Sequence, residues 1–142
     1  MIQKIATNSE TETELVGERL VHELPTGSVV AFFGDLGMGK TAFVRGMCRG
    51  IGYTGEVTSP TFAIVHEYVG GKIPLYHFDM YRVSGPDDLY SCGYYDYLGT
   101  GILAIEWSEN IEDALPDDTV RIRILRGKTD SQRIIEIERQ EA

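Results

Sequence analysis

A chain of 142 residues has the length of one globular domain, and its 42% hydrophobic and 25% charged residues exclude an intrinsically disordered protein. We therefore expect a single domain over residues 1–142. Thirteen basic and 22 acidic residues give a net charge of −9, which argues against strong direct binding to nucleic acid.

No uncharged apolar run could cross a bilayer and no signal peptide is present, so we expect a cytoplasmic protein without membrane contact. Two cysteines at no metal-ligand spacing, Cys48 and Cys92, are expected to be reduced thiols.

The first third of the sequence predicts a helix, a strand, a glycine-rich turn and a second helix, in that order. Capping and acidic residues at positions 8–12 precede apolar residues at helical spacing, which predicts a helix that ends at Pro25. Residues 28–33 are nearly all apolar, the pattern of a strand buried on both faces of a mostly parallel sheet. Residues 41–49 follow the turn and have helical character as far as Gly50.

The rest of the chain predicts further strands and short helices. Strand-like runs at residues 63–69 and 73–78 are joined by two glycines, which suit a tight hairpin. Short helical pieces are expected within residues 84–98, and further strands at residues 102–105, 120–125 and 134–137. Together these elements predict an α/β fold with a mixed, mostly parallel central sheet, flanking helices and one antiparallel hairpin.

The turn between the first predicted strand and the second helix matches the phosphate-binding motif G-x-x-x-x-G-K-[ST]. Backbone N–H groups of such a P-loop and of the following helix N-terminus surround phosphate oxygens. Lys40 would neutralise the β- and γ-phosphates of ATP, and Thr41 would ligate Mg²⁺. Met38 is the unusual residue, because its bulky side chain must point away from the phosphates. The residues predicted to bind the nucleotide are Leu36, Gly37, Met38, Gly39, Lys40 and Thr41.

Two acidic residues stand at the ends of predicted strands, where a metal-bound nucleotide needs a carboxylate. Glu106 follows residues 102–105, and Asp79 follows residues 73–78. We expect Glu106 to hold Mg²⁺ and Asp79 to orient the attacking water, and the sequence leaves the reverse assignment open. The predicted catalytic residues are Lys40, Asp79 and Glu106.

Other residues near these motifs have plainer interpretations. Trp107 could stack on a base or a partner, but a single tryptophan is more often a core or rim residue. His66 and His77 have no carboxylate or cysteine cluster at metal-ligand spacing, so we interpret them as packing residues. Residues 58–62 lie where P-loop proteins place a loop that senses the γ-phosphate, although a plain loop stiffened by a proline would have the same composition.

The order and spacing of these motifs resemble the TsaE (YjeE/YdiB) family. The segments that carry the resemblance are residues 34–41, 59–62, 77–82 and 105–107. A P-loop alone is common to many superfamilies, whereas residues 77–82 combined with the Glu106-Trp107 pair are specific. The resemblance extends from residue 13 to about residue 137 and implies a P-loop NTPase fold.

The resemblance also implies a function. Members of the family are weak, Mg²⁺-dependent ATPases required, with TsaB and TsaD, for the N6-threonylcarbamoyladenosine modification of tRNA near the anticodon. Hydrolysis would reset the partner complex, and tRNA would be reached through the partners, in agreement with the acidic net charge. The resemblance places the segment 9–13 and Arg133 near adenine. The residues that it implies for nucleotide sensing and partner contact are Ser59, Thr61, Arg82 and Trp107.

Two other functions would use the same P-loop. A small-molecule kinase needs a basic lid, and the absence of arginine and lysine between Pro86 and Gly101 argues against one there. A non-hydrolytic switch module, in which ATP binding alone changes the affinity for a partner, fits the motifs nearly as well. The sequence therefore favours an ATPase and keeps the switch as its main alternative.

Overall fold

The computed structural model describes residues 2–33, 39–57 and 65–139. All the predicted helices and strands are present, and β1 is an additional strand. The strands are β1 (Ile2–Thr7), β2 (Val29–Phe33), β3 (Val65–Tyr68), β4 (Leu75–Asp79), β5 (Ile102–Glu106), β6 (Val120–Arg126) and β7 (Arg133–Glu138). The helices are α1 (Glu10–His22), α2 (Lys40–Gly50), α3 (Pro86–Ser91), α4 (Tyr94–Tyr97) and the 3-10 helix η1 (Ser108–Ala114).

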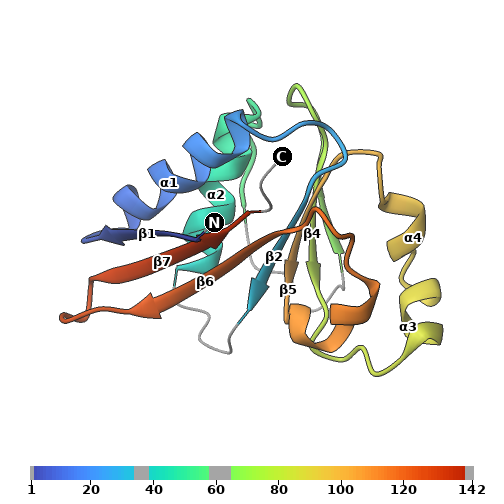
Figure 1. Ribbon diagram of the computed structural model, residues 1–142. Helices are drawn as coiled ribbons and strands as arrows, with labels where there is room; N and C mark the ends of the chain where they lie inside the picture. Colours follow the sequence, from blue (N-terminus) through green and yellow to red (C-terminus); the bar gives the residue numbers. More distant parts are fainter. Residues whose placement is uncertain (1, 34–38, 58–64, 140–142) are drawn as a thin grey trace.

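The seven strands form one sheet in the order β1-β7-β6-β2-β5-β4-β3 (Figure 1). Its centre is parallel, because β2 pairs in parallel with β5 and with β6, and β4 pairs in parallel with β5. The outer pairs are antiparallel, namely β3 with β4, β7 with β6, and β1 with β7. This confirms an α/β fold with a mixed sheet, a mostly parallel centre and the predicted hairpin of β3 and β4.

The sheet separates two apolar cores. Alternate residues of a strand point to opposite faces, so Val30 and Phe32 of β2 join the core packed with α1 and α2, whereas Val29 joins the core packed with α3, α4 and η1. Figure 1 shows α1 and α2 together on one side of the sheet and α3 and α4 beside β4 and β5. Every residue of β2 and β5 is buried, as their continuous apolar runs predict.

Helices α1 and α2 pack against each other at close range. Helix α1 begins at Ser9, whose hydroxyl oxygen accepts a hydrogen bond from the N–H of Glu12 at 3.2 Å. A Cβ atom added to Gly46 of α2 would lie 1.8 Å from the backbone carbonyl oxygen of Glu14 in α1. Only glycine allows this approach, which fixes the position of α2 and therefore of the P-loop residues at its start.

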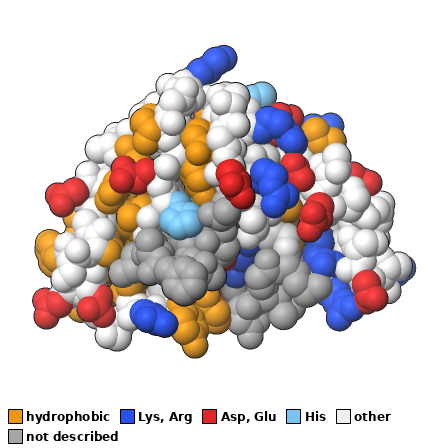
Figure 2. Space-filling model, turned by 180° about the vertical axis from the view of Figure 1, so that it is seen from behind, with side chains coloured by type: hydrophobic (Ala, Val, Ile, Leu, Met, Phe, Trp, Pro, Cys, Tyr) orange, Lys and Arg blue, Asp and Glu red, His pale blue; other side chains and the backbone are white. Residues whose placement is uncertain are grey.

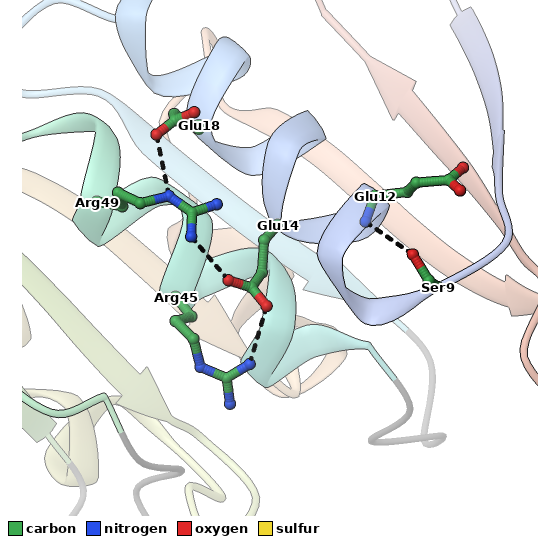
Figure 3. Close-up of polar contacts among 6 residues, drawn as sticks. All are labelled: Ser9, Glu12, Glu14, Glu18, Arg45 and Arg49. Carbon is green, nitrogen blue, oxygen red and sulfur yellow. Dashed lines mark hydrogen bonds and ion pairs between the residues drawn. The ribbon is translucent and has the colours of Figure 1, made fainter.

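Ion pairs join the exposed sides of the same two helices (Figure 3). The carboxylate of Glu14 lies 3.4 Å from a guanidinium nitrogen of Arg45 and 3.0 Å from one of Arg49, and Arg49 also reaches Glu18 at 3.0 Å. Figure 2 shows blue and red side chains interspersed on this side of the molecule. These pairs are half exposed, so they contribute less to the free energy of unfolding than the close helix packing does.

Both cysteines are free, as expected. Cys48 is a residue of α2 that faces the core, where burial raises the pKa of its thiol to about 12. Cys92 is half buried, and its thiol donates to the carbonyl oxygen of Leu89 at 3.4 Å. Neither thiol is therefore arranged as a reactive group. None of the helices that the structure describes is long and apolar enough to span a membrane.

Candidate active site

The ends of β4 and β5 bring two predicted site residues together. The two strands pair in parallel with Asp79 opposite Glu106. Both side chains point to the face covered by α2, since Leu75 and Ile102, which share their orientation, belong to the core packed with α1 and α2. The structure thus places two carboxylates side by side at the edge where parallel strands of an α/β sheet bind ligands.

Glu106 has a partner that sequence reasoning missed. Glu106 is only 8% exposed, and its Oε2 atom lies 2.7 Å from Nε2 of His77. The side chain of His77 is fully buried. The interpretation of His77 as a packing residue is therefore incomplete. One signal in the sequence could have found it, because His77 stands two residues before Asp79 and must share its face of β4.

Asp79 is held in a tight turn. Its Oδ1 accepts a hydrogen bond from the N–H of Tyr81 at 2.9 Å. The side-chain amide of Asn110, in η1, donates to the carbonyl oxygens of Met80 at 2.8 Å and Tyr81 at 3.2 Å. Because the turn after β4 is bonded to the helix after β5, the two carboxylates are supported by a common frame. Arg82, which ends this turn, is exposed.

Trp107 links the end of β5 to the start of α2. Its backbone has a φ of 59° and a ψ of 41°, the left-handed conformation that non-glycine residues rarely adopt. Its ring lies 4.9 Å from the ring of Tyr81, measured between centroids, and the Nζ atom of Lys40 lies 5.8 Å from the centre of the indole. The predicted P-loop lysine is therefore close to the residue that directly follows Glu106.

Helix α2 begins at the predicted phosphate-binding residues. Gly39 caps the helix with a φ of 94°, a conformation that favours glycine. Lys40 is only 2% exposed, and Thr41 is half buried. The first N–H groups of α2 and the positive end of its dipole are directed to the place where the motif predicts phosphate.

A cavity of about 450 Å³ opens beside the start of α2. It lies between α1, α2 and the turn that joins β6 to β7, and both acidic and basic side chains line it. Its lining residues are Ser9, Glu10, Thr13, Gly39, Thr41, Ala42, Arg45, Asp130, Ser131 and Arg133. The segment 9–13 and Arg133, which the resemblance places near adenine, thus share one cavity with Thr41.

Several of the predicted site residues lie outside the part of the chain that the structure describes. Leu36, Gly37 and Met38 of the P-loop lie outside the described residues. The same holds for Ser59 and Thr61 of the segment expected to sense the γ-phosphate. From the predicted set, the structure brings Lys40 close to Trp107 and pairs Asp79 with Glu106.

The donors that the site offers fit magnesium bound together with a nucleotide. Within residues 2–33, 39–57 and 65–139, no three His, Cys, Asp or Glu side chains are grouped so that they could hold a metal ion. Mg²⁺ is usually held by one or two protein oxygens, with phosphate oxygens and water as the other ligands. A hydroxyl from Thr41 and a carboxylate oxygen from Glu106 would be a donor set of this kind.

Residues 7–135 match the profile of the family described as "Threonylcarbamoyl adenosine biosynthesis protein TsaE". Three related proteins share the name tRNA threonylcarbamoyladenosine biosynthesis protein TsaE. The one from Bacillus subtilis is 38% identical over 132 residues, which cover 92% of this chain and 82% of that protein. The one from Treponema pallidum is 38% identical over 135 residues, or 94% of this chain and 98% of that protein. The one from Synechocystis is 46% identical over 103 residues, or 70% of this chain and 66% of that protein.

A solved structure agrees with these matches. The crystal structure of Bacillus subtilis YdiB has a TM-score of 0.77 and 35% sequence identity, and the alignment covers 96% of this chain and 84% of that chain. Sequence and fold therefore match over nearly the same residues. The chain belongs to the TsaE family of tRNA threonylcarbamoyladenosine biosynthesis proteins.

Proposed function

We propose that this chain is a weak, Mg²⁺-dependent ATPase that acts with TsaB and TsaD in the N6-threonylcarbamoyladenosine modification of tRNA. Membership of the TsaE family supports the pathway, because its named relatives belong to that biosynthesis. One observation carries the ATPase activity: Nζ of Lys40 lies 5.8 Å from the ring centre of Trp107, the residue after Glu106. The predicted phosphate-binding lysine thus lies close to the residue that directly follows Glu106, which supports a shared site of the kind that ATP hydrolysis requires.

Each predicted site residue has a role in this proposal. The phosphates of ATP would be bound by Lys40 and by the backbone of Leu36, Gly37, Met38, Gly39 and Thr41. Thr41 and Glu106 would hold Mg²⁺, which supplies positive charge against the phosphates when it is bound. Asp79 would orient the attacking water through Oδ2, because its Oδ1 already accepts the Tyr81 N–H.

The cavity beside α2 is our candidate for the nucleoside. Thr41 and Gly39, at the phosphate end, line the same space as Thr13 and Arg133. Its volume of about 450 Å³ lies within the usual range for small-molecule sites. Because Arg45 and Arg133 also line it, the local field can favour a nucleotide in a chain whose net charge is −9.

The partner contacts are proposed for residues near the γ-phosphate position. Ser59, Thr61, Arg82 and Trp107 would couple the nucleotide state to TsaB and TsaD. Two of these are described: Arg82 is exposed, and Trp107 is half buried next to Lys40. Direct contact with tRNA is disfavoured by the acidic surface, so the partners would carry the tRNA.

A non-hydrolytic switch is the second candidate, and one contact favours it. Oδ1 of Asp79 is already bonded within its own turn, at 2.9 Å from the Tyr81 nitrogen. A carboxylate so engaged has one oxygen fewer to act on water, which suits a protein that binds ATP and hydrolyses it slowly. A small-molecule kinase has no comparable support, because no arginine or lysine stands in α3 or α4.

The ATPase proposal is tested by measuring ATP hydrolysis with and without TsaB and TsaD. We expect the partners to stimulate the wild-type chain, and Lys40→Ala and Glu106→Gln to lower the rate by about 10²-fold, the usual effect of removing a charge-stabilising group. Asp87→Asn, a change at an exposed acidic residue on α3, is the matched control and should leave the rate unchanged. A rate that the partners do not stimulate and that Lys40→Ala does not lower would contradict the ATPase.

The number of rounds of tRNA modification per complex distinguishes the ATPase from the non-hydrolytic switch. If hydrolysis resets the complex, Asp79→Asn and Glu106→Gln allow at most one round of modification per complex. If these variants abolish hydrolysis but sustain many rounds, the chain is a switch and hydrolysis is incidental.

A further inference from the structure

Glu106 is the acidic residue that the proposed function assigns to Mg²⁺, and it is nearly buried. Only 8% of the residue is exposed. A buried carboxylate costs free energy unless an opposite charge or a hydrogen-bond donor compensates its lost hydration. The structure gives it a candidate donor in His77, whose Nε2 lies 2.7 Å from Oε2.

The register of β4 and β5 explains how the histidine reaches the carboxylate. His77 pairs with Ala104, and Glu106 lies two residues further along the neighbouring strand, on the same face of the sheet. The small methyl group of Ala104 leaves the imidazole room to lean along the strand. The contact is therefore a diagonal one between neighbouring strands, and the fully buried ring has no access to solvent.

Three polar atoms at this point are buried: Nδ1 and Nε2 of His77 and Oε2 of Glu106. Within the described part of the chain, none of the three has a hydrogen bond of standard geometry. The 2.7 Å approach of Nε2 to Oε2 is therefore the interaction available to offset the burial of that oxygen. A side chain that served packing alone would not need to bring two polar atoms this close.

We propose that His77 is a positioning residue whose ring holds Oε2 of Glu106 inside the protein, so that Oε1 is the oxygen directed to the nucleotide and its Mg²⁺. The inference rests on the proposed function, because it assumes that Glu106 serves the nucleotide site. His77 touches neither metal nor nucleotide in this arrangement. It acts by fixing which carboxylate oxygen is available and in which direction it points.

Two amide variants separate positioning from packing. In His77→Gln the side-chain nitrogen can take the place of Nε2, whereas in His77→Asn the same group is one methylene shorter and takes the place of Nδ1. Both variants keep a polar amide at the same buried position. If His77 only packs, the two variants should lose similar amounts of Mg²⁺-dependent nucleotide affinity. If His77 positions Glu106, His77→Gln should keep most of the Mg²⁺-dependent affinity that His77→Asn loses.

The first measurement is the affinity for a non-hydrolysable ATP analogue, in EDTA and in excess Mg²⁺. The ratio of the two dissociation constants reports how strongly Mg²⁺ and nucleotide binding are coupled. We expect His77→Asn to reduce this ratio by about tenfold or more, a typical effect of removing a partner of a metal ligand, and His77→Gln to reduce it by less than about threefold. Affinity in EDTA should stay the same in both. Equal losses in the two variants, or no loss in His77→Asn, would overturn the proposal.

A second measurement needs no variant at position 77 and no nucleotide. The chain has three histidines, so ¹⁵N-labelled histidine gives a spectrum simple enough to follow individual ring nitrogens. We expect an Nε2 proton that exchanges slowly with solvent in the wild-type chain and rapidly in Glu106→Ala. If no ring nitrogen shows this behaviour, His77 does not hold Glu106. Failure of the wild-type chain to bind nucleotide would instead refute the proposed function, and the spectrum would still decide the role of His77.

Discussion

Trp107 has a left-handed backbone conformation that no other non-glycine residue adopts in the described ranges. Such a conformation costs on the order of 1–3 kcal/mol and persists only where neighbouring contacts impose it. Here the hydroxyl of Ser108 donates to the carbonyl oxygen of Ile105 at 2.9 Å, and Asn110 is bonded to the turn after β4. The strained conformation places the indole close to both Tyr81 and Lys40. Strain at this point is consistent with a functional residue rather than with the core or rim position that its type alone favours.

The position of Trp107 predicts a change in its fluorescence when nucleotide binds. It is the one tryptophan of the chain, and its ring centre lies 5.8 Å from the ammonium group of Lys40. Phosphates bound at Lys40 would bring several negative charges near the indole and alter its emission. We expect saturating ATP and Mg²⁺ to change the emission of the wild-type chain, and the tryptophan-free variant Trp107→Phe to show no signal. Unchanged emission in a chain that calorimetry shows to be saturated would contradict this placement.

Among the elements, α1 supports α2, the helix that begins at the predicted P-loop residues. Gly46 allows the backbone of α2 to approach Glu14 of α1, and Gly17 does the same from the other helix, since a Cβ there would lie 2.2 Å from the carbonyl oxygen of Phe43. At such a close contact between backbones, no side chain is present that could change its conformation to relieve an overlap. The separation of α1 and α2 is therefore set by backbone atoms.

A substitution at Gly46 tests this contact. Helix propensity alone predicts that Gly46→Ala stabilises α2 by about 1 kcal/mol. We expect the opposite, a loss of about 1–3 kcal/mol, because the new methyl would overlap a backbone oxygen that cannot rotate away. Urea unfolding followed by circular dichroism measures the difference. Gly85→Ala is the control, because its Cβ would meet no atom within 4 Å, and it should cost less than about 1 kcal/mol. Equal stability of the two variants would show that the helices can move apart freely.

Some strands of the sheet can be predicted from the sequence and others cannot. Strands β2 and β5 are predictable because strands buried on both faces read as unbroken apolar runs. Strand β1 is not, because Gln3 and Lys4 are exposed on an outer strand whose existence depends on pairing with β7, more than 120 residues away. The pairing of Asp79 with Glu106 follows from the rule that parallel strands end at one edge. The face of His77 follows from the alternation of side chains along a strand, but its 2.7 Å approach to Glu106 depends on side-chain conformations that no sequence pattern specifies.

On the scale of the whole molecule, the excess of negative charge comes from one segment of the chain. Residues 83–120 contain nine acidic residues and no basic one, whereas the remaining residues have equal numbers of both. This segment includes α3, α4 and η1, which cover one face of the sheet. The cavity beside α2 belongs to the balanced part, and its lining includes Arg45 and Arg133 as well as Glu10 and Asp130. A net charge of −9 therefore does not oppose ATP at the site, although it does disfavour direct contact with tRNA.

Lys40 and Glu106 are proposed to belong to one site for ATP and Mg²⁺. Calorimetric titration of ATP in the presence of Mg²⁺ tests it most directly, with the wild-type chain and Lys40→Ala compared under the same conditions. We predict one site per chain and an affinity that falls by about tenfold or more in Lys40→Ala, since the lysine makes charge-assisted contacts with phosphate. No binding to the wild-type chain, or equal affinity in the two proteins, would contradict the claim.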